Sequence, residues 1–260
     1  MQPNYDLKEE IRAFWSERSE TFDESVAHRI EERHGMPEWQ ALVRQALDLA
    51  PGARADGVRA LDLACGTGEI SRLLCSLGAE VTGLDFSEAM LARATQKLSG
   101  LAWTPVLGDA ERLLTLADQS FDFAMTRHLA WTLTDPEAAY AEWFRVLRPG
   151  GRLLVNDGDW AGRNTIAYRL RRVLADLLAR KPEEDEETRA EHREIFQRLP
   201  YREGLSAERL TDALRSAGFA FVRALDTGPL YGRAMRSHGL ADRLRQTREN
   251  RFSLVFERPI

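Results

Sequence analysis

The stretch "LDLACGTGEI", residues 61–70, decides the fold, because a glycine turn joins an apolar run to a helical pattern there. A strand that passes through such a turn into a helix is the ligand-binding unit of doubly wound α/β proteins. Asp62 would repel a dinucleotide pyrophosphate, and Glu69 at the helix start would oppose any phosphate. Ser71 also replaces the third glycine of the dinucleotide pattern. The turn therefore predicts a ligand that is not a dinucleotide.

The rest of the chain repeats this alternation of short apolar runs and helical patterns. Strands are predicted at residues 58–64, 80–85, 102–108, 121–126, 151–157, 219–226 and 251–259. Helices are predicted at residues 69–78, 87–99, 136–147 and 206–218. Pro105 indicates an edge strand, and the last two strands are expected to pair antiparallel across a loop at 227–250. The pattern predicts an α/β protein with a doubly wound, seven-stranded, mostly parallel sheet.

Four regions follow from this pattern: a helical N-terminal cap (1–50), a ligand-binding core (51–160), a helical insertion (161–205), and a C-terminal helix and strand pair (206–260). The first cap helix is expected to carry Phe14, Trp15 and Phe22. In the insertion an amphipathic helix is predicted by a stripe made of Ile166, Leu170, Val173, Leu177 and Leu178. The acidic run 183–187 is interpreted as a solvated face or loose turn. Residues 1–35 and 161–205 are expected to close over the site when ligand binds.

Composition limits the classes of partner. The 260 residues are 43% apolar and 30% charged, with a net charge of −5, which disfavours nucleic acid and anionic membranes. The two cysteines, Cys65 and Cys75, suit a reducing compartment, and no Cys/His cluster has zinc spacing. No apolar run has the length of a signal peptide core or a membrane span. We expect a cytoplasmic monomer or homodimer without a metal, without a nucleic-acid partner and without a membrane.

Polar residues stand at the ends of successive predicted strands: Asp62, Asp85, Asp109 and His128. In doubly wound sheets the ligand lies beyond these carboxyl ends. A positive group beside Asp62 and a ribose beside Asp85 would satisfy both carboxylates. A sulfonium amino acid joined to adenosine fits this requirement.

The chain here resembles the class I S-adenosylmethionine-dependent methyltransferases, in the small-molecule branch that includes the ubiquinone-biosynthesis type. The matching pieces are "LDLACGTG", "VTGLDFS", "GDAERL", "FDFAMTRHLAWTL" and "FRVLRPGGRLLVND". The resemblance implies the Rossmann-like methyltransferase fold, S-adenosylmethionine as cofactor, and cofactor contacts from Asp62, Ala64, Gly66, Thr67, Gly68, Asp85, Phe86, Asp109 and Ala110. Ala64 stands where the family usually has glycine, a modest change if its φ is negative.

The acceptor side is defined less sharply. His128 is the leading candidate for a general base, because an ordinary pKa near 6.5 suits proton removal at neutral pH; packing or a backbone contact is the alternative. Arg127 is assigned to the cofactor's carboxylate, with an acidic substrate as the other option. Candidates for the acceptor pocket are Phe22, Trp131, Asn156, Asp157 and Tyr168. Core packing is the favoured explanation for Trp131, and turn formation is an equal one for "NDGD" (156–159).

The sequence thus predicts an enzyme that transfers a methyl group from S-adenosylmethionine to a small-molecule acceptor. No "NPPY"-like motif follows the fourth strand, which argues against methylation of bases in nucleic acid. The accepting atom (N, O or C) stays open. Two alternatives also stay open. One is an enzyme that cyclises S-adenosylmethionine to azetidine-2-carboxylate and releases methylthioadenosine. The other is a non-catalytic S-adenosylmethionine-binding protein.

Overall fold

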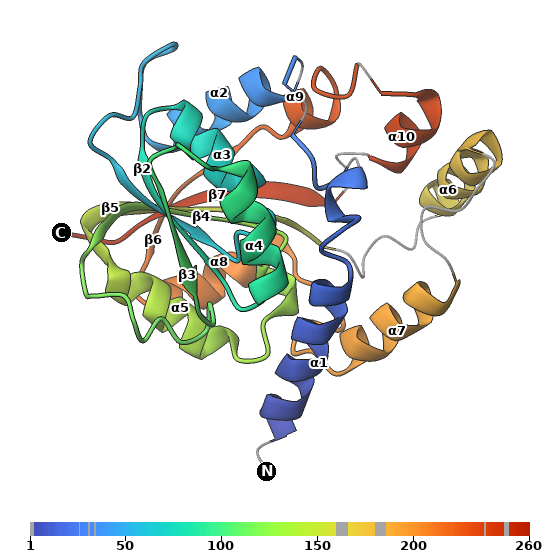
Figure 1. Cartoon of the computed structure of the whole chain (residues 1–260), viewed down its shortest axis with the longest axis horizontal. Helices are drawn as coiled ribbons and strands as arrows, with labels where there is room; N and C mark the ends of the chain where they lie inside the picture. Colours follow the sequence, from blue (N-terminus) through green and yellow to red (C-terminus); the bar gives the residue numbers. More distant parts are fainter. Residues whose placement is uncertain are drawn as a thin grey trace.

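The computed structural model describes residues 3–25, 27–30, 32–33, 35–159, 166–179, 186–236, 238–246 and 250–260. Its centre is a seven-stranded sheet with the order β3-β2-β1-β4-β5-β7-β6 (Figure 1). The strands are β1 (Arg59–Leu63), β2 (Glu80–Asp85), β3 (Trp103–Leu107), β4 (Phe121–Arg127), β5 (Leu147–Gly158), β6 (Ala220–Leu225) and β7 (Arg251–Glu257). The predicted doubly wound sheet is confirmed, with strand β3, which contains Pro105, at one edge.

Strands β1 to β5 pair in parallel, and β7 is antiparallel to both β5 and β6. Arg127 at the end of β4 pairs with Asn156 of β5, and Gly158 of β5 pairs with Arg251 at the start of β7. The start of β7 therefore lies at the same edge of the sheet as the carboxyl ends of the parallel strands. Since ligands bind along that edge in such folds, β7 contributes residues to the site as well.

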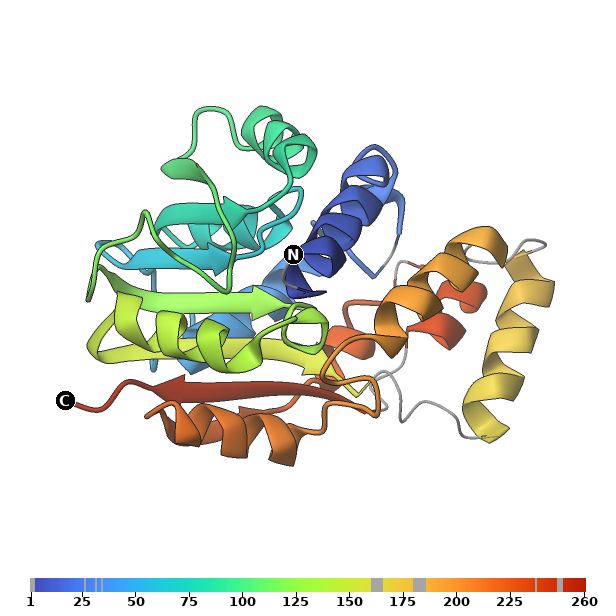
Figure 2. The same ribbon diagram turned by 90° about the horizontal axis from the view of Figure 1, so that it is seen from below.

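Helices cover both faces of the sheet (Figure 2). One core joins the sheet to α1 (Pro3–Glu17), α5 (Pro136–Val146), α7 (Glu186–Gln197) and α8 (Ala207–Ser216). A second core joins the other face to α2 (Met36–Ala46), α3 (Glu69–Ser76) and α9 (Gly228–Tyr231). The N-caps follow the sequence: Ser87 begins α4 (Glu88–Lys97) and Ser206 begins α8, each accepting a hydrogen bond from a backbone amide three residues later.

The N-terminal cap differs from its prediction in the place of Phe22. Phe22 is not in the first helix, because α1 ends at Glu17 and Phe22 begins a separate 3-10 turn, η1 (Phe22–Glu24). Leu7, Ile11 and Phe14 of α1 are buried in the same core as the sheet. Burying three such side chains stabilises the packing of α1 on the sheet by several kcal/mol. Closure of residues 1–35 and 161–205 over the site on ligand binding stays a prediction.

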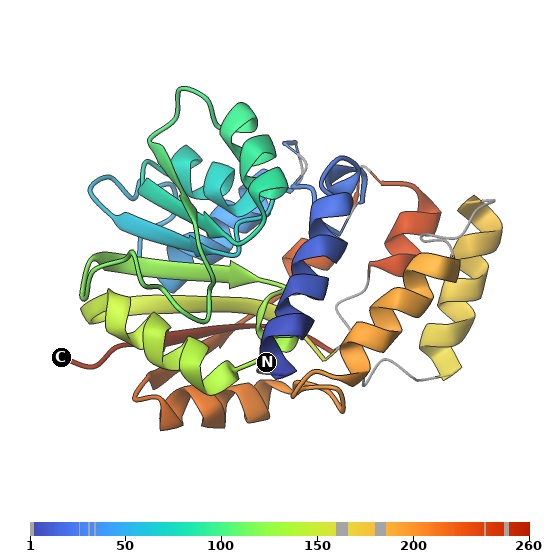
Figure 3. The same ribbon diagram turned by 60° about the horizontal axis from the view of Figure 1, so that its bottom comes forward.

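The region between β6 and β7 was predicted as a loop but contains α9 and α10 (Leu240–Arg245). Helix α10 packs against α6 (Ile166–Ala179), away from the sheet (Figure 3). The apolar stripe of α6 is exposed, with 77% of Ile166 and 71% of Leu177 accessible. Only residues 186–187 of the acidic run are described, and they begin α7.

Candidate functional site

The turn after β1 is a tight pocket of backbone. Gly66 and Gly68 both have left-handed φ, +54° and +85°. A Cβ on Gly68 would lie 2.8 Å from Leu98 Cδ1 and 3.1 Å from the Cβ of Ala94, so only glycine allows the loop to touch α4. Thr67 is buried between them. The glycines therefore allow the tight turn between β1 and α3, and contact of this turn with the cofactor stays a prediction.

Ala64 corrects one expectation, because its φ is +56° rather than negative. A side chain in this region costs about 1–2 kcal/mol. Since glycine loses about 0.4–1 kcal/mol through its freer unfolded chain, Ala64→Gly is expected to raise the free energy of unfolding by up to about 1 kcal/mol. Urea titration measures it. The matched control is Ala138→Gly in α5, which should lose about 0.5–1 kcal/mol. Equal losses in both variants would show that Ala64 is not strained.

Two buried carboxylates flank this turn. Asp62 is 1% exposed and accepts a hydrogen bond from the Ser71 hydroxyl at 2.7 Å. Asp85 accepts from the backbone amides of Gly66 and Ser87, at 2.8 and 2.9 Å. Burial raises the pKa of Asp62 to about 7 and that of Asp85 to about 6. Burial makes the ionised form of each carboxylate costly. A ligand with a positive group and hydroxyl donors would stabilise the ionised form of both.

The residues predicted to meet an adenine lie on the other side of Asp85. Phe86 is half-buried against the first core, and Ala110 is buried with its carbonyl accepting from Trp143 Nε1 at 2.8 Å. Asp109 accepts from the amide of Glu111 and pairs with Lys8 Nζ at 2.5 Å. The structure therefore brings all the predicted cofactor residues except Arg127 to the ends of β1, β2 and β3.

A second group gathers at the ends of β4 and β5. His128 has a left-handed φ of +62°, and its ring nitrogen Nε2 lies 3.5 Å from Arg251 Nη1. Asn156 is 1% exposed; it donates from Nδ2 to Ser253 Oγ at 2.6 Å, while its Oδ1 has no hydrogen-bond partner in the described chain. Arg127 precedes His128 in the chain and is the register partner of Asn156 across β4 and β5. Arg251 was not predicted, since nothing in its sequence shows which edge β7 would occupy.

The other residues predicted for the acceptor pocket do not lie together. Trp131 is buried on the opposite face, against His192 and Phe196 of α7. Asp157 accepts from the amides of Ala130 and Gly158, so it holds the backbone of the β4–α5 connection. The side chain of Tyr168, on α6, lies outside the described residues.

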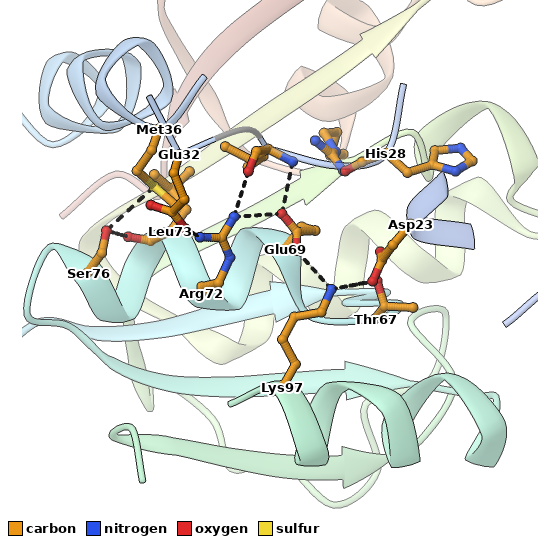
Figure 4. Close-up of polar contacts among 12 residues, drawn as sticks. Asp23, His28, Glu32, Met36, Thr67, Glu69, Arg72, Leu73, Ser76 and Lys97 are labelled. Atoms are coloured by element: carbon orange, nitrogen blue, oxygen red, sulfur yellow. Dashed lines mark hydrogen bonds and ion pairs between the residues drawn. The ribbon is translucent and has the colours of Figure 1, made fainter. Parts of the chain in front are cut away.

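The segment after α1 covers the glycine turn (Figure 4). The ring of Phe22 lies 3.7 Å from the position of a Cβ on Gly66 and stacks on His28. Asp23 accepts from the Thr67 hydroxyl at 2.5 Å and from Lys97 Nζ at 2.6 Å. Lys97 also binds Glu69 at 2.8 Å. Phe22, which was predicted for the acceptor pocket, therefore lies over the cofactor turn.

Sequence reasoning missed this set of ion pairs. Lys8 and Lys97 are two of only three lysines in the chain, and both bind across to another segment: Lys8 to Asp109 and Glu111, Lys97 to Asp23 and Glu69. The scarcity of lysine was a signal, but the partners lie from 28 to 103 positions away, as the residue numbers show. No local pattern encodes contacts at that separation.

Comparison with known proteins assigns the domain. Residues 61–155 match the methyltransferase domain family. The demethylmenaquinone methyltransferase of Beutenbergia cavernae is 39% identical over 45% of this chain and 45% of its own length. The ubiquinone/menaquinone biosynthesis C-methyltransferase UbiE of Desulfotalea psychrophila is 35% identical over 62% of this chain and 65% of its own length. The chain spans between 35% and 65% of the first curated relatives it matches.

Solved structures agree on the fold. The putative methyltransferase in complex with the Haloferax volcanii Trm112 activator has a TM-score of 0.59 at 18% identity, over 95% of both chains. An S-adenosylmethionine-dependent methyltransferase from Aquifex aeolicus has a TM-score of 0.55 at 17% identity, over 85% of this chain and 89% of its own. At such identities the likeness concerns the fold alone.

The sheet order, the glycine turn and the two strand-end carboxylates define a Rossmann-like methyltransferase domain. The match to the methyltransferase domain family covers residues 61–155, and the fold is that of class I S-adenosylmethionine-dependent methyltransferases. The curated relatives that it resembles include enzymes named for ubiquinone and menaquinone biosynthesis. None of the described helices is both long and apolar enough to cross a membrane.

Proposed function

We propose that the protein transfers the methyl group of S-adenosylmethionine to a small-molecule acceptor. The observation that carries the proposal is the pair of buried carboxylates, Asp62 and Asp85, beside a glycine turn at adjacent strand ends. Both have a raised pKa because burial leaves their charge poorly compensated. The relatives described above are named for demethylmenaquinone methylation and for ubiquinone and menaquinone biosynthesis, and the acceptor of this chain is a separate question.

The residues of this chain have distinct tasks in such a reaction. Asp62 would hold the amino group of the cofactor, and Asp85 its ribose hydroxyls, with Phe86, Asp109 and Ala110 around the adenine. When bound, S-adenosylmethionine supplies an electrophilic methyl group on a positively charged sulfur. His128 would accept the proton of the acceptor atom, where that atom carries one. Holding the partners in line is worth roughly 7–11 kcal/mol, so positioning is the larger part of the task.

Binding and product analysis test the proposal together. Calorimetry should detect binding of S-adenosylmethionine and S-adenosylhomocysteine but not of NAD. Incubation with S-adenosylmethionine alone should release almost no methylthioadenosine. Absence of binding by either cofactor form would overturn the site assignment. Methylthioadenosine formed without an acceptor would instead show the cyclising reaction.

Asp85→Ala is expected to weaken S-adenosylhomocysteine binding by roughly 1.5–3 kcal/mol, because a hydrogen bond to a charged group is lost. That is about a ten- to hundredfold rise in Kd, measured by calorimetry. Asp122→Ala is the matched control, since Asp122 also lies on a strand but at the opposite edge, where it pairs with Arg148. Unchanged affinity in Asp85→Ala would mean that the ribose binds elsewhere.

Binding should also depend on pH through Asp62. Its pKa of about 7 in the folded protein lies above the ordinary value of 3.8, so the ligand-free site is protonated below neutrality. A positively charged amino group needs the ionised form. Affinity should therefore be full above the pKa and fall as pH drops through it, by up to about tenfold per unit.

Calorimetry with S-adenosylhomocysteine between about pH 6 and about pH 8 measures this slope. Asp62→Asn should bind more weakly at the upper end and lose most of the pH dependence. A residual slope near pH 6 would come from Asp85, whose pKa is about 6. If wild type and Asp62→Asn show the same slope, Asp62 does not face the amino group.

A further inference from the structure

A pocket lies beyond the ends of β4 and β5, separate from the glycine turn. The empty space in and around it amounts to about 460 Å³, much of which is open to solvent. Its polar lining consists of Arg29, Arg127, His128, Tyr231, His238 and Gln246. Among the described residues that line it there is neither Asp nor Glu, in a chain whose net charge is −5. Positive charge is therefore concentrated where an acceptor would lie next to His128.

Arg127 is the central cation of this pocket. Its guanidinium donates to the backbone carbonyl of His28 and lies 5.4 Å from the centre of the Trp39 ring. Within the described chain, no carboxylate comes within 4.0 Å of it. Burial lowers the pKa of Arg127, and the more distant charges of Glu69 and Asp62 oppose this shift in part. The guanidinium is half-buried and contacts one carbonyl and one aromatic ring. Its other N–H groups can donate to a planar anion that binds in a bidentate manner.

Neighbouring groups add donors instead of negative charge. Arg251 donates to the Tyr231 hydroxyl at 3.1 Å and to Gln246 Oε1 at 2.7 Å. These two oxygens accept hydrogen bonds from Arg251. The Tyr231 O–H and the Gln246 NH₂ can then act as hydrogen-bond donors. Burial lowers the pKa of His28 to about 4, so its ring is neutral and carries no charge to compete.

The remaining lining is Gly35 and six apolar or aromatic residues: Ala27, Ile30, Trp39, Leu230, Ala234 and Met235. Apolar walls with a few convergent polar groups are typical of small-molecule sites. An acceptor with a flat or aliphatic body could pack on Trp39 while its charged end meets Arg127. This arrangement separates the body of the ligand from its anion within one pocket.

Resting on the proposed methyl transfer, we propose that the acceptor is an organic carboxylate with an apolar body. Its carboxylate binds the Arg127 guanidinium, and its nucleophilic atom lies beside His128, the next residue of the chain. Arg127 is then a specificity-determining residue of the acceptor site. This reassigns Arg127 from the cofactor, since none of the glycine-turn residues lines the pocket that contains it.

The test uses matched acids and amides on the full chain saturated with S-adenosylhomocysteine. The probes are benzoate, 4-hydroxybenzoate, 4-aminobenzoate, phenylacetate and indole-3-acetate, each beside its primary amide, with phenyl phosphate as the competing anion. Thermal shift finds the ligands and calorimetry gives Kd. At least one acid should bind ten times or more tightly than its amide.

Arg127→Met should weaken the acid at least tenfold and leave its amide and S-adenosylhomocysteine unchanged. Arg127→Lys keeps the charge but loses the planar guanidinium. Its affinity for the acid should lie between that of wild type and that of Arg127→Met. It also serves as the second variant if methionine impairs folding. Arg236→Met is the control, because Arg236 is exposed and adjacent to the lining residue Met235 but not part of the lining.

The outcomes separate the two proposals. Equal binding of acids and amides, including no binding of either, overturns the carboxylate assignment, as does an acid preference that survives Arg127→Met. Tighter binding of phenyl phosphate than of every acid would make the acceptor a phosphate ester. A loss of S-adenosylhomocysteine affinity in Arg127→Met would return Arg127 to the cofactor. Failure of wild type to bind S-adenosylhomocysteine would instead refute the proposed function itself.

Discussion

His128→Asn is expected to lower turnover by about 10²–10⁴-fold, the usual contribution of a placed general base. Asparagine is the informative replacement, because His128 has a φ of +62° and asparagine tolerates that region better than alanine. The fold and the affinity for S-adenosylhomocysteine should therefore stay as in wild type. The assay measures S-adenosylhomocysteine released with whichever acid the acceptor panel yields as a substrate.

The control for His128→Asn is His238→Asn, since His238 lines the same pocket on a different segment. It should lose less than about tenfold in turnover, as expected of a residue outside proton transfer. If His128→Asn keeps most of its activity, His128 only positions the acceptor. An acceptor that carries no proton on its nucleophilic atom would give that same result and would leave positioning as the whole of catalysis.

Trp143→Ala should cost about 3–5 kcal/mol of folding free energy, the largest stability effect expected here. Trp143 is fully buried in the first core and stacks edge-on to Tyr140, with ring centres 5.2 Å apart. Its indole N–H also satisfies the carbonyl of Ala110, at 2.8 Å. The substitution removes the ring and leaves that carbonyl without its donor. Denaturant titration measures the loss, together with an expected fall in the affinity for S-adenosylhomocysteine.

Trp143→Phe separates the two contributions. It keeps most of the buried ring and loses only the hydrogen bond, so about 1–3 kcal/mol should be lost. The affinity for cofactor should fall in both variants if the indole positions Ala110 at the adenine edge. A loss below about 1 kcal/mol in Trp143→Ala would contradict the packing described for this core.

The strand pattern could be predicted from the sequence because each strand is a short apolar run with turn-forming residues on both sides. The ends of β1, β2 and β4 were predicted within one residue, which is why Asp62, Asp85 and His128 were found together. β5 begins earlier than predicted, at Leu147, because "RPGG" continues the extended backbone instead of leaving the sheet. The helices α9 and α10 were missed, since each has six residues or fewer and too little periodicity to detect.

The backbone of Ala64 shows a different limit. Its residue type favours negative φ, and only the packing of the turn against β2, where the Cys65 amide donates to the Leu84 carbonyl at 2.9 Å, holds it at +56°. Trp131 shows a further limit of prediction from the sequence, because residues near one another in sequence can face different sides of the sheet. It is three residues from His128, yet the 3-10 turn η2 (Ala130–Thr132) directs it to the opposite face of the sheet. Proximity in sequence does not predict a shared pocket where the chain turns.

The sequence by itself determined the class of fold, the cofactor turn and the carboxylates at the strand ends, because these depend on local patterns of a few residues. Tertiary structure alone decided which distant groups meet: Asp23 with Lys97, Lys8 with Asp109, and Arg251 with the pocket of Arg127. Such contacts depend on strand order and helix packing. The free energy that selects them is summed over the whole core, so no short segment records it.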